Sequence, residues 1–464
     1  MLNLPTVRQQ ANRPNERECN TDWYSLLTSG GTWGERMKKS RRYLLALVHA
    51  IAAGSITVAC GGGSQESGNE LPGDSGPEVA ESAPVSSDEL GPPTGPEMIV
   101  GLVNSEGSPG LDFPDIRRFI EAAVAYTNEH GGFGNRPITL ETCIAKGSPE
   151  TSQACAQELV GKNAELVLLG FDLFPDYKTY AAADVPVIGV LPILAPDYTA
   201  DALFVTGGNV TSQAAIASVA KEHFQAASAS IIHADNPGSN STAASLQAAL
   251  DKAGITWTAV KGGDNETDAG YQGLMREAAS SDPDVIVSLY AEAGCIGAMR
   301  GRALLGIQIP VITTAACADK DVIDQVGDDA TGWMFAGLAE DVATPERNLQ
   351  RRLLAPVLGV DESELTTASY GLGGLGYLMY MSLVEATQKM LDSGIEVTGR
   401  SLYDYMKGGN GLTLFGSDNP LECGVVAAYP AVCSFVFPFA EYKGGGVIGP
   451  VDGLGLVDSK TYLP

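Results

Sequence analysis

The 464-residue sequence is poor in the residues that most enzymes use for acid–base and metal chemistry. It has four histidines and no Cys-x-x-Cys pair, so we do not expect a zinc site built from these ligands. The patterns Gly-x-Ser-x-Gly, His-Glu-x-x-His and Gly-x-x-x-x-Gly-Lys-Ser/Thr, which mark hydrolases, metalloproteases and nucleotide-binding loops, are absent. We therefore expect no enzyme activity, no metal and no cofactor.

Basic residues are also scarce. The chain carries 29 Lys and Arg against 56 Asp and Glu, which gives a net charge of −27 and a pI near 4.4. A chain of this charge is repelled by nucleic acids and by anionic membrane surfaces. We therefore do not expect it to bind nucleic acids, or to bind anionic lipids through a basic patch. Beyond residue 97 no long compositionally biased tract occurs, so most of the chain is predicted to be globular.

The chain has one long apolar run of note, at residues 43–59. The basic stretch "MKKSRR" precedes it, the run ends at Ala59, and Cys60 and Gly61 follow. Basic residues, an apolar run and small residues before a cysteine are typical of an export signal, and the pattern resembles a bacterial lipoprotein signal. We therefore expect Cys60 to be the acylated first residue of the mature protein, with Met37 as a plausible start. An uncleaved membrane anchor and ordinary signal cleavage are the alternatives.

The segment after Cys60 is rich in Gly, Ser, Pro and acidic residues and has almost no apolar residue. Such a composition cannot form a core, so residues 60–96 are predicted to be a flexible acidic linker. Residues 1–59 are then an upstream extension and signal, and the working part of the protein starts near residue 97.

Six cysteines follow the linker, and they form three closely spaced couples: Cys143 with Cys155, Cys295 with Cys317, and Cys423 with Cys433. Six cysteines allow fifteen pairings, and pairing of near neighbours is the simplest. Disulfides of this kind fit an oxidising, extracytoplasmic compartment.

From residue 98 onward, short apolar runs alternate with helical patterns. Strands are expected at 98–103, 138–144, 164–170 and 185–190, and a second series at 230–235, 257–261, 284–290 and 310–316. Strands that alternate with helices of 10–15 residues predict parallel sheets with helices on both faces. Two such series predict an α/β fold of two doubly wound lobes.

Several segments carry a resemblance to a known family. They are "MIVGLVNSEGSPG", "RRFIEAAVAYTNEHGGFGNRPITLETC", "VPVIG", "IIHADNPGS", "GGDNETDAGYQGLMREAASSDPDVIVSLYA" and "ASYGLGGLGYLMYMSLVEA". In this order they resemble the leucine/isoleucine/valine-binding protein family, the type I solute-binding components of ABC importers. The resemblance covers residues 97 to about 450.

The resemblance implies two lobes joined by a three-segment hinge that close on a small solute. The first lobe would comprise 97–208 and 339–425, and the second 209–338 and 426–464. It also implies a monomer that delivers its solute to permease and ATPase subunits from the outer face of the cell membrane. A surface-anchored ligand sensor that performs no transport is the alternative, and an adhesin or structural lipoprotein is a third.

The sequence departs from this family where the family binds its amino acid. The family's Gly-Pro-x-x-Ser turn is replaced by "GFDLFPD", with Phe174 in the place of the serine, and the next turn, "VLPILAP", has no hydroxyl. We therefore predict a solute with an apolar or aromatic body. The candidate ligand-binding residues are Glu106, Phe171, Asp172, Phe174, Leu191, Asn236, Tyr290, Glu292 and Thr314. The alternative is that 171–174 packs into the lobe and the ligand lies elsewhere.

Overall fold

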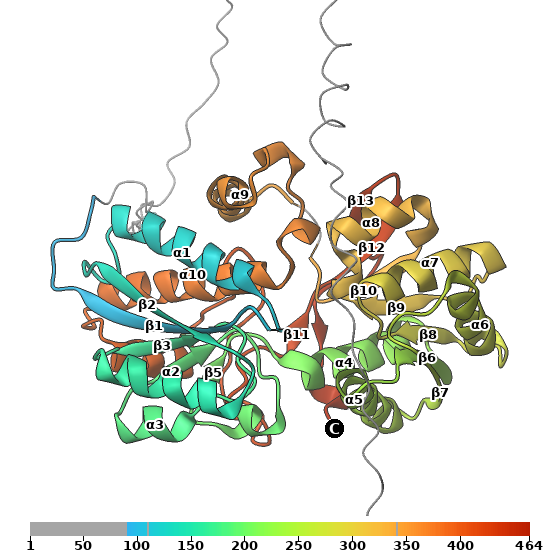
Figure 1. The fold of residues 1–464 in the computed structure, drawn as a ribbon, viewed down its shortest axis with the longest axis horizontal. Helices are drawn as coiled ribbons and strands as arrows, with labels where there is room; N and C mark the ends of the chain where they lie inside the picture. The colour runs from blue at the N-terminus through green and yellow to red at the C-terminus, as the bar shows by residue number, and fades with distance from the viewer. Residues whose placement is uncertain (1–90, 109–110, 340–341) are drawn as a thin grey trace, which may run out of the picture. The chain divides into compact units, whose positions relative to one another are not determined.

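The computed structural model describes residues 91–108, 111–339 and 342–464 (Figure 1). The predicted export signal, the predicted acylation site Cys60 and the linker before residue 91 lie outside these described residues. Ser82–Pro464 forms a compact unit of its own, and the fold below is that of its described part.

The first sheet contains five parallel strands in the order β2-β1-β3-β4-β5. Their bounds are Met98–Ser105 (β1), Ile138–Ala145 (β2), Leu166–Leu169 (β3), Val187–Gly189 (β4) and Leu203–Phe204 (β5). Alternate residues of β1 enter different cores: Val100 and Leu102 belong to one apolar cluster and Val103 to another. Because side chains alternate across a strand, the sheet is covered on both faces.

Helices from two distant parts of the chain cover this sheet. They are Pro114–Glu129 (α1), Pro149–Gly161 (α2), Tyr177–Ala182 (α3), Pro345–Leu358 (α9), Gly371–Asp392 (α10) and Gly399–Lys407 (α11). Figure 1 shows α1 and α10 side by side, and their buried residues share one core. Residues of α2 and α3 fill the core on the opposite face. The segment around α10 therefore completes the first lobe although it follows the second sheet in sequence.

The second sheet has seven strands in the order β13-β12-β10-β9-β8-β6-β7. Their bounds are Ser228–Ala234 (β6), Thr256–Gly262 (β7), Val285–Ser288 (β8), Val311–Thr314 (β9), Trp333–Ala336 (β10), Phe439–Gly444 (β12) and Val447–Pro450 (β13). Strands β6 to β10 pair in parallel. Strand β12 pairs antiparallel with both β10 and β13. An antiparallel hairpin thus closes one edge of an otherwise parallel sheet.

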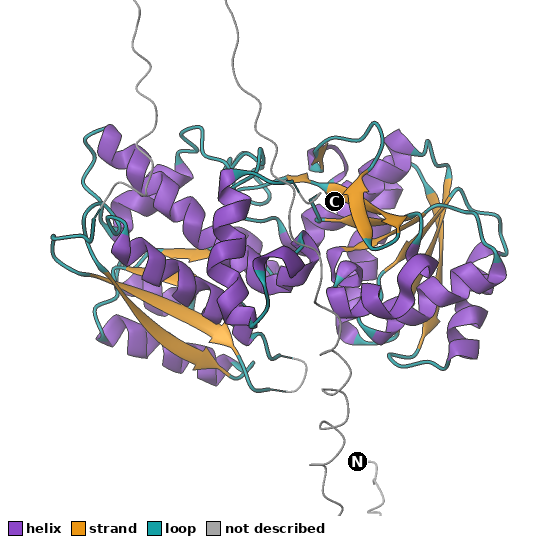
Figure 2. Cartoon of the chain, turned by 90° about the horizontal axis from the view of Figure 1, so that it is seen from above, coloured by secondary structure: helices purple, strands orange, loops and turns teal. Residues whose placement is uncertain are grey.

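The second sheet is also covered on both faces. One core takes residues of Gly208–Ser218 (α4) and Pro237–Ala253 (α5). The other takes residues of Asp268–Ala279 (α6), Ala293–Leu305 (α7) and Lys320–Val326 (α8). Figure 2 shows the strands of both sheets lying between helices. Both sheets are therefore doubly wound, as the alternating sequence pattern predicts.

The chain passes between the two sheets three times. It crosses between β5 and α4, between β10 and α9, and again just before Val436–Phe437 (β11), which pairs with Val457–Asp458 (β14). At the third crossing Phe204 forms a parallel bridge with Val432. Phe204 N donates to Ala431 O at 2.8 Å, and Cys433 N donates to Phe204 O at 2.9 Å. The first and third crossings are thus joined by backbone hydrogen bonds.

The three disulfides pair near neighbours, and this prediction is confirmed. Cys143–Cys155 joins β2 to α2 within the first lobe, and Cys295–Cys317 joins α7 to the turn after β9 within the second. Cys423–Cys433 closes a loop that ends at the third crossing. One disulfide therefore lies next to the hinge and two lie inside the lobes.

Most predicted elements form, with ends that differ by a few residues. Helix α1 begins at Pro114 and ends at Glu129, just before Gly131, which takes a positive φ of 92°. Helices α3, α8, α9 and α11 and the short strands β5, β13 and β14 were not predicted from the sequence. In the part of the chain that the structure describes, no helix is both long and apolar enough to cross a membrane.

The position of Cys423–Cys433 generates a prediction about local stability. Closing a loop of 10 residues with a disulfide stabilises it by about 2–3 kcal/mol. In the Cys423→Ser/Cys433→Ser variant we expect the amides of Phe204 and residue 433 to exchange with deuterium on the order of a hundredfold faster. The matched control is Cys143→Ser/Cys155→Ser, which should leave these two amides protected. Equal protection in both variants would contradict a role for this disulfide at the hinge.

Candidate functional site

The predicted ligand residues all lie at the carboxyl ends of parallel strands. In the first lobe they follow β1 (Glu106), β3 (Phe171, Asp172, Phe174) and β4 (Leu191). In the second lobe they follow β6 (Asn236) and β8 (Tyr290, Glu292) or end β9 (Thr314). In α/β sheets of this kind ligands bind outside the carboxyl ends of the strands. Each lobe therefore brings its own predicted residues to the edge where a ligand is expected.

Asn104 connects the loops of the first lobe, and sequence analysis missed it. Its side chain is fully buried at the end of β1. Asn104 Nδ2 donates to Phe113 O at 2.8 Å and to Glu106 Oε1 at 3.1 Å, and Asn104 Oδ1 accepts from Phe171 N at 3.0 Å. Buried polar groups are usually satisfied in this way. The sequence held one signal for Asn104, because it is a polar residue near the end of an otherwise apolar strand.

Glu106 is held by a basic partner within its own lobe. Arg117 Nε donates to Glu106 Oε1 at 2.8 Å, and Arg117 Nη2 donates to Glu106 Oε2 at 3.0 Å. Burial, the largest influence, raises the pKa of Glu106. The hydrogen bonds from Arg117 and Asn104 and the charges of Arg117 and Lys146 outweigh it, so the pKa is lowered. Glu106 is thus ionised and already paired before any ligand arrives.

Apolar side chains dominate the remainder of this edge. The rings of Phe113 and Phe171 lie 4.4 Å apart between centroids. Phe171 and Leu191 are half-buried against the main core of the lobe. Phe174 is 36% exposed and Leu194 is 38% exposed. The edge therefore offers aromatic and aliphatic surface to a ligand.

Asp172 points into the lobe. It is buried, and its Oδ1 accepts from Ser152 Oγ at 2.6 Å and from Phe174 N at 3.2 Å. Burial raises the pKa of Asp172. The side chain proposed from sequence as a ligand contact thus supports the turn that carries Phe174.

Asp197 supports the neighbouring loop, and sequence analysis missed this residue as well. Asp197 Oδ2 accepts from Ile193 N and from Leu194 N, both at 2.8 Å, and Asp197 Oδ1 accepts from Tyr177 Oη at 2.7 Å. The carboxylate is 2% exposed. It fixes the backbone of the loop that follows β4, in which the Leu194 side chain is exposed.

The edge of the second lobe is more polar. Asn236 caps α5: its Oδ1 accepts from Ser239 N at 2.8 Å, and its Nδ2 donates to Asp264. Glu292, which is exposed, precedes α7 with φ 46° and ψ −117°. This conformation is strained for any residue other than glycine, and such strain concentrates at binding sites. Thr314 is partly exposed at the end of β9.

Tyr290 lies deeper than the other predicted residues of this lobe. It is buried, and its ring packs edge-on against Tyr271 with the centroids 5.6 Å apart. Burial also raises its pKa. In this structure the Tyr290 side chain packs as part of the core.

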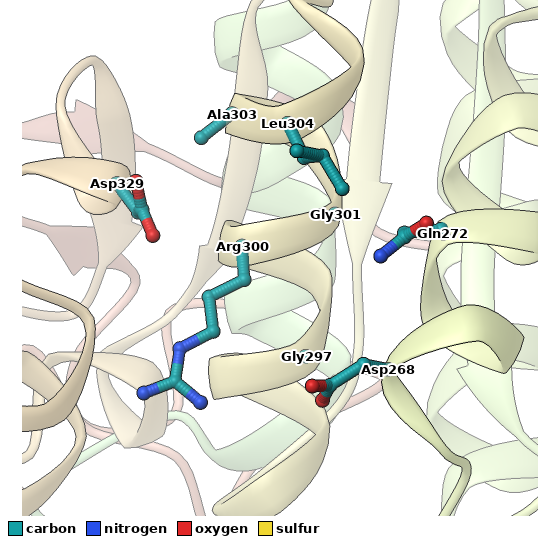
Figure 3. Close-up of a pocket in the computed structure, with 8 residues that line it drawn as sticks. All are labelled: Asp268, Gln272, Gly297, Arg300, Gly301, Ala303, Leu304 and Asp329. Atoms are coloured by element: carbon teal, nitrogen blue, oxygen red, sulfur yellow. The ribbon is translucent and has the colours of Figure 1, made fainter.

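A pocket of about 380 Å³ lies on the outer side of α6 and α7 and includes none of the predicted residues (Figure 3). It forms where the two helices pack closely at Gly297, because a Cβ there would stand 2.0 Å from the ring of Tyr271. In Figure 3, Arg300 and Asp329 lie on one side of α7, and Gln272 and Asp268 lie on the other. The polar groups do not converge on one point, so the hollow is explained by helix packing.

In the described ranges no three His, Cys, Asp or Glu side chains gather closely enough to hold a metal ion. His233 is buried in β6, and its Nδ1 lies 2.9 Å from Ala234 O. His130 follows α1, with its Nδ1 2.7 Å from Tyr126 O.

Comparison with solved structures shows the same fold in several binding proteins. One is the ABC transporter substrate-binding protein from Sphaerobacter thermophilus, with a TM-score of 0.60 and 18% identity over 78% of this chain and 96% of that chain. A solute-binding protein of an ABC transporter from R. palustris, in complex with benzoate, has a TM-score of 0.55 and 14% identity over 78% and 96% of the chains. The branched-chain amino acid transporter substrate-binding protein from Streptococcus pneumoniae, in complex with isoleucine, has a TM-score of 0.55 and 13% identity over 78% and 99%.

A search of curated proteins found no match. A family model described as Periplasmic binding protein matches residues 99–419. This match confirms the resemblance noted in the sequence, and with the fold it confirms the two-lobed α/β architecture. The chain belongs to the periplasmic binding protein family.

Proposed function

We propose that this chain is an extracytoplasmic lipoprotein that captures a small organic solute between its two lobes and delivers it to an ABC importer. The solute has an apolar or aromatic body. The observation that carries this proposal is the apolar edge of the first lobe, where Phe171, Phe174, Leu191 and Leu194 are partly exposed at the carboxyl ends of the strands. Soluble proteins rarely expose such side chains together without a partner.

In this proposal the first lobe, 97–208 and 339–425, binds the apolar body, and the second lobe, 209–338 and 426–464, binds the polar end. Asn236, Glu292 and Thr314 are the polar contacts of the second lobe. The chain crosses between the sheets at three places, which fits a hinge, so binding would close the lobes on the solute. The solved relatives include complexes with benzoate and with isoleucine, which are both small organic solutes.

The lipid anchor rests on the sequence around Cys60. Acylation there would tether the folded unit to the membrane through residues 61–96 and keep it beside its permease and ATPase partners. The three disulfides agree with an oxidising compartment.

A thermal-shift screen on residues 82–464 tests the solute class. This segment contains all three disulfides of the described residues, and its equivalent in the relatives forms nearly the whole solved chain. A ligand at a hundredfold excess over its Kd stabilises the native state by about 2.7 kcal/mol. We expect aromatic and aliphatic compounds to raise the Tm. We expect Phe174→Ala to weaken their binding about tenfold, because it removes exposed apolar surface from the site.

The matched control for that screen is Leu391→Ala, because Leu391 is 42% exposed at the end of α10 and does not follow a strand. It should bind as the unaltered chain does. Stabilisation by branched-chain amino acids alone, with no effect of Phe174→Ala, would contradict the proposed solute class. No stabilisation by any compound would contradict solute capture.

The anchor has its own test. When cells are labelled with a radioactive fatty acid, Cys60→Ser should abolish labelling and release the protein from the membrane fraction. Cys19→Ser is the control, because Cys19 precedes the predicted signal and should have no effect. Unchanged labelling of Cys60→Ser would exclude this cysteine as the anchor.

A further inference from the structure

Four backbone amides in the two apolar loops of the first lobe donate to side-chain acceptors of the same lobe. The pairs are Phe171 N with Asn104 Oδ1, Phe174 N with Asp172 Oδ1, Ile193 N with Asp197 Oδ2, and Leu194 N with Asp197 Oδ2. The three acceptor residues are at most 4% exposed. These amides are therefore occupied from inside the lobe and do not need a ligand to satisfy them.

The hydrogen bonds to Asp197 occupy two amides that could otherwise bind the carboxylate of a ligand. Its carboxylate receives the two adjacent amides just before the short helix Ala195–Thr199, each at 2.8 Å. Adjacent backbone N–H groups at such a position are a common binding site for a carboxylate. Here the carboxylate is the protein's own, and the Tyr177 hydroxyl holds its second oxygen.

Several other possible donors near this edge are absent or already paired. Pro175, Pro192 and Pro196 lie in the same two loops and have no N–H. Two basic side chains near the edge are committed to Glu106: Arg117 pairs with its carboxylate, and Lys146 Nζ donates to its backbone oxygen at 2.9 Å. A ligand carboxylate placed here would lose its hydration and gain few partners.

We propose that Asn104, Asp172 and Asp197 are specificity-determining positioning residues. By accepting the loop amides, they present the apolar side chains of the loops to the solute and prevent the first lobe from binding a carboxylate. The solute is then an apolar or aromatic compound without a carboxylate on the end that faces the first lobe. This inference rests on the proposed function, since it concerns the same edge.

The first test uses pairs of compounds that differ in the carboxylate. Benzoate is compared with benzyl alcohol, and isoleucine with 2-methylbutylamine, by titration calorimetry on residues 82–464. We expect the member without the carboxylate to bind at least tenfold more tightly. Tighter binding of the carboxylates would overturn this inference and leave solute capture intact. No binding of any of the four compounds would overturn the proposed solute class and this inference with it.

The second test changes the acceptor. Asp197→Ala frees the amides of Ile193 and Leu194, and it should shift the affinity ratio at least tenfold toward the carboxylates. Asp197→Asn is the matched control, because its amide oxygen can still accept both N–H groups while its NH₂ faces the Tyr177 hydroxyl. It should keep the ratio of the unaltered chain within about threefold.

Equal shifts in the two variants would overturn the role of the occupied amides, because both variants remove the charge and only one frees the N–H groups. Melting curves and circular dichroism check that each variant folds. If Asp197→Ala does not fold, the affinities of the two compound pairs for the unaltered chain and for Asp197→Asn still decide whether the first lobe disfavours a carboxylate.

Discussion

Hydrogen bonds from loop amides to buried acceptors hold the loops at the proposed binding edge of the first lobe. Asn104 alone joins the end of β1, the start of α1 and the loop after β3. Each such bond contributes on the order of 1 kcal/mol, and a buried acceptor left without its donor costs more. Apolar side chains can remain exposed at this edge because the polar backbone beneath them is already satisfied.

The two parallel sheets give these loops a fixed base. Both faces of each sheet are covered, so the strands are held on both sides and their carboxyl ends stay in register. In the proposed closure the lobes move about the crossings, where Phe204 bonds to the chain beside Cys433. The Cys423–Cys433 disulfide cross-links the chain next to the third crossing. The other two disulfides cross-link elements within each lobe.

The sequence was sufficient to predict the doubly wound lobes and the neighbour pairing of the cysteines, because both follow from local patterns. It was not sufficient for the site. Asn104 and Phe171 are 67 residues apart, and no local pattern shows that they bond. Asp172 was expected to contact ligand, and the structure shows it buried, with its carboxylate accepting from Phe174 N within the turn. Helix α9 was missed because its apolar face is narrow and interrupted by arginines.

The central claim is that a small solute is held between two lobes that close on it. Small-angle X-ray scattering of residues 82–464, with and without a solute found in the thermal-shift screen, tests this claim most directly. The account predicts that the radius of gyration falls when the solute is bound. A solute that binds and leaves the scattering curve unchanged would contradict capture by lobe closure.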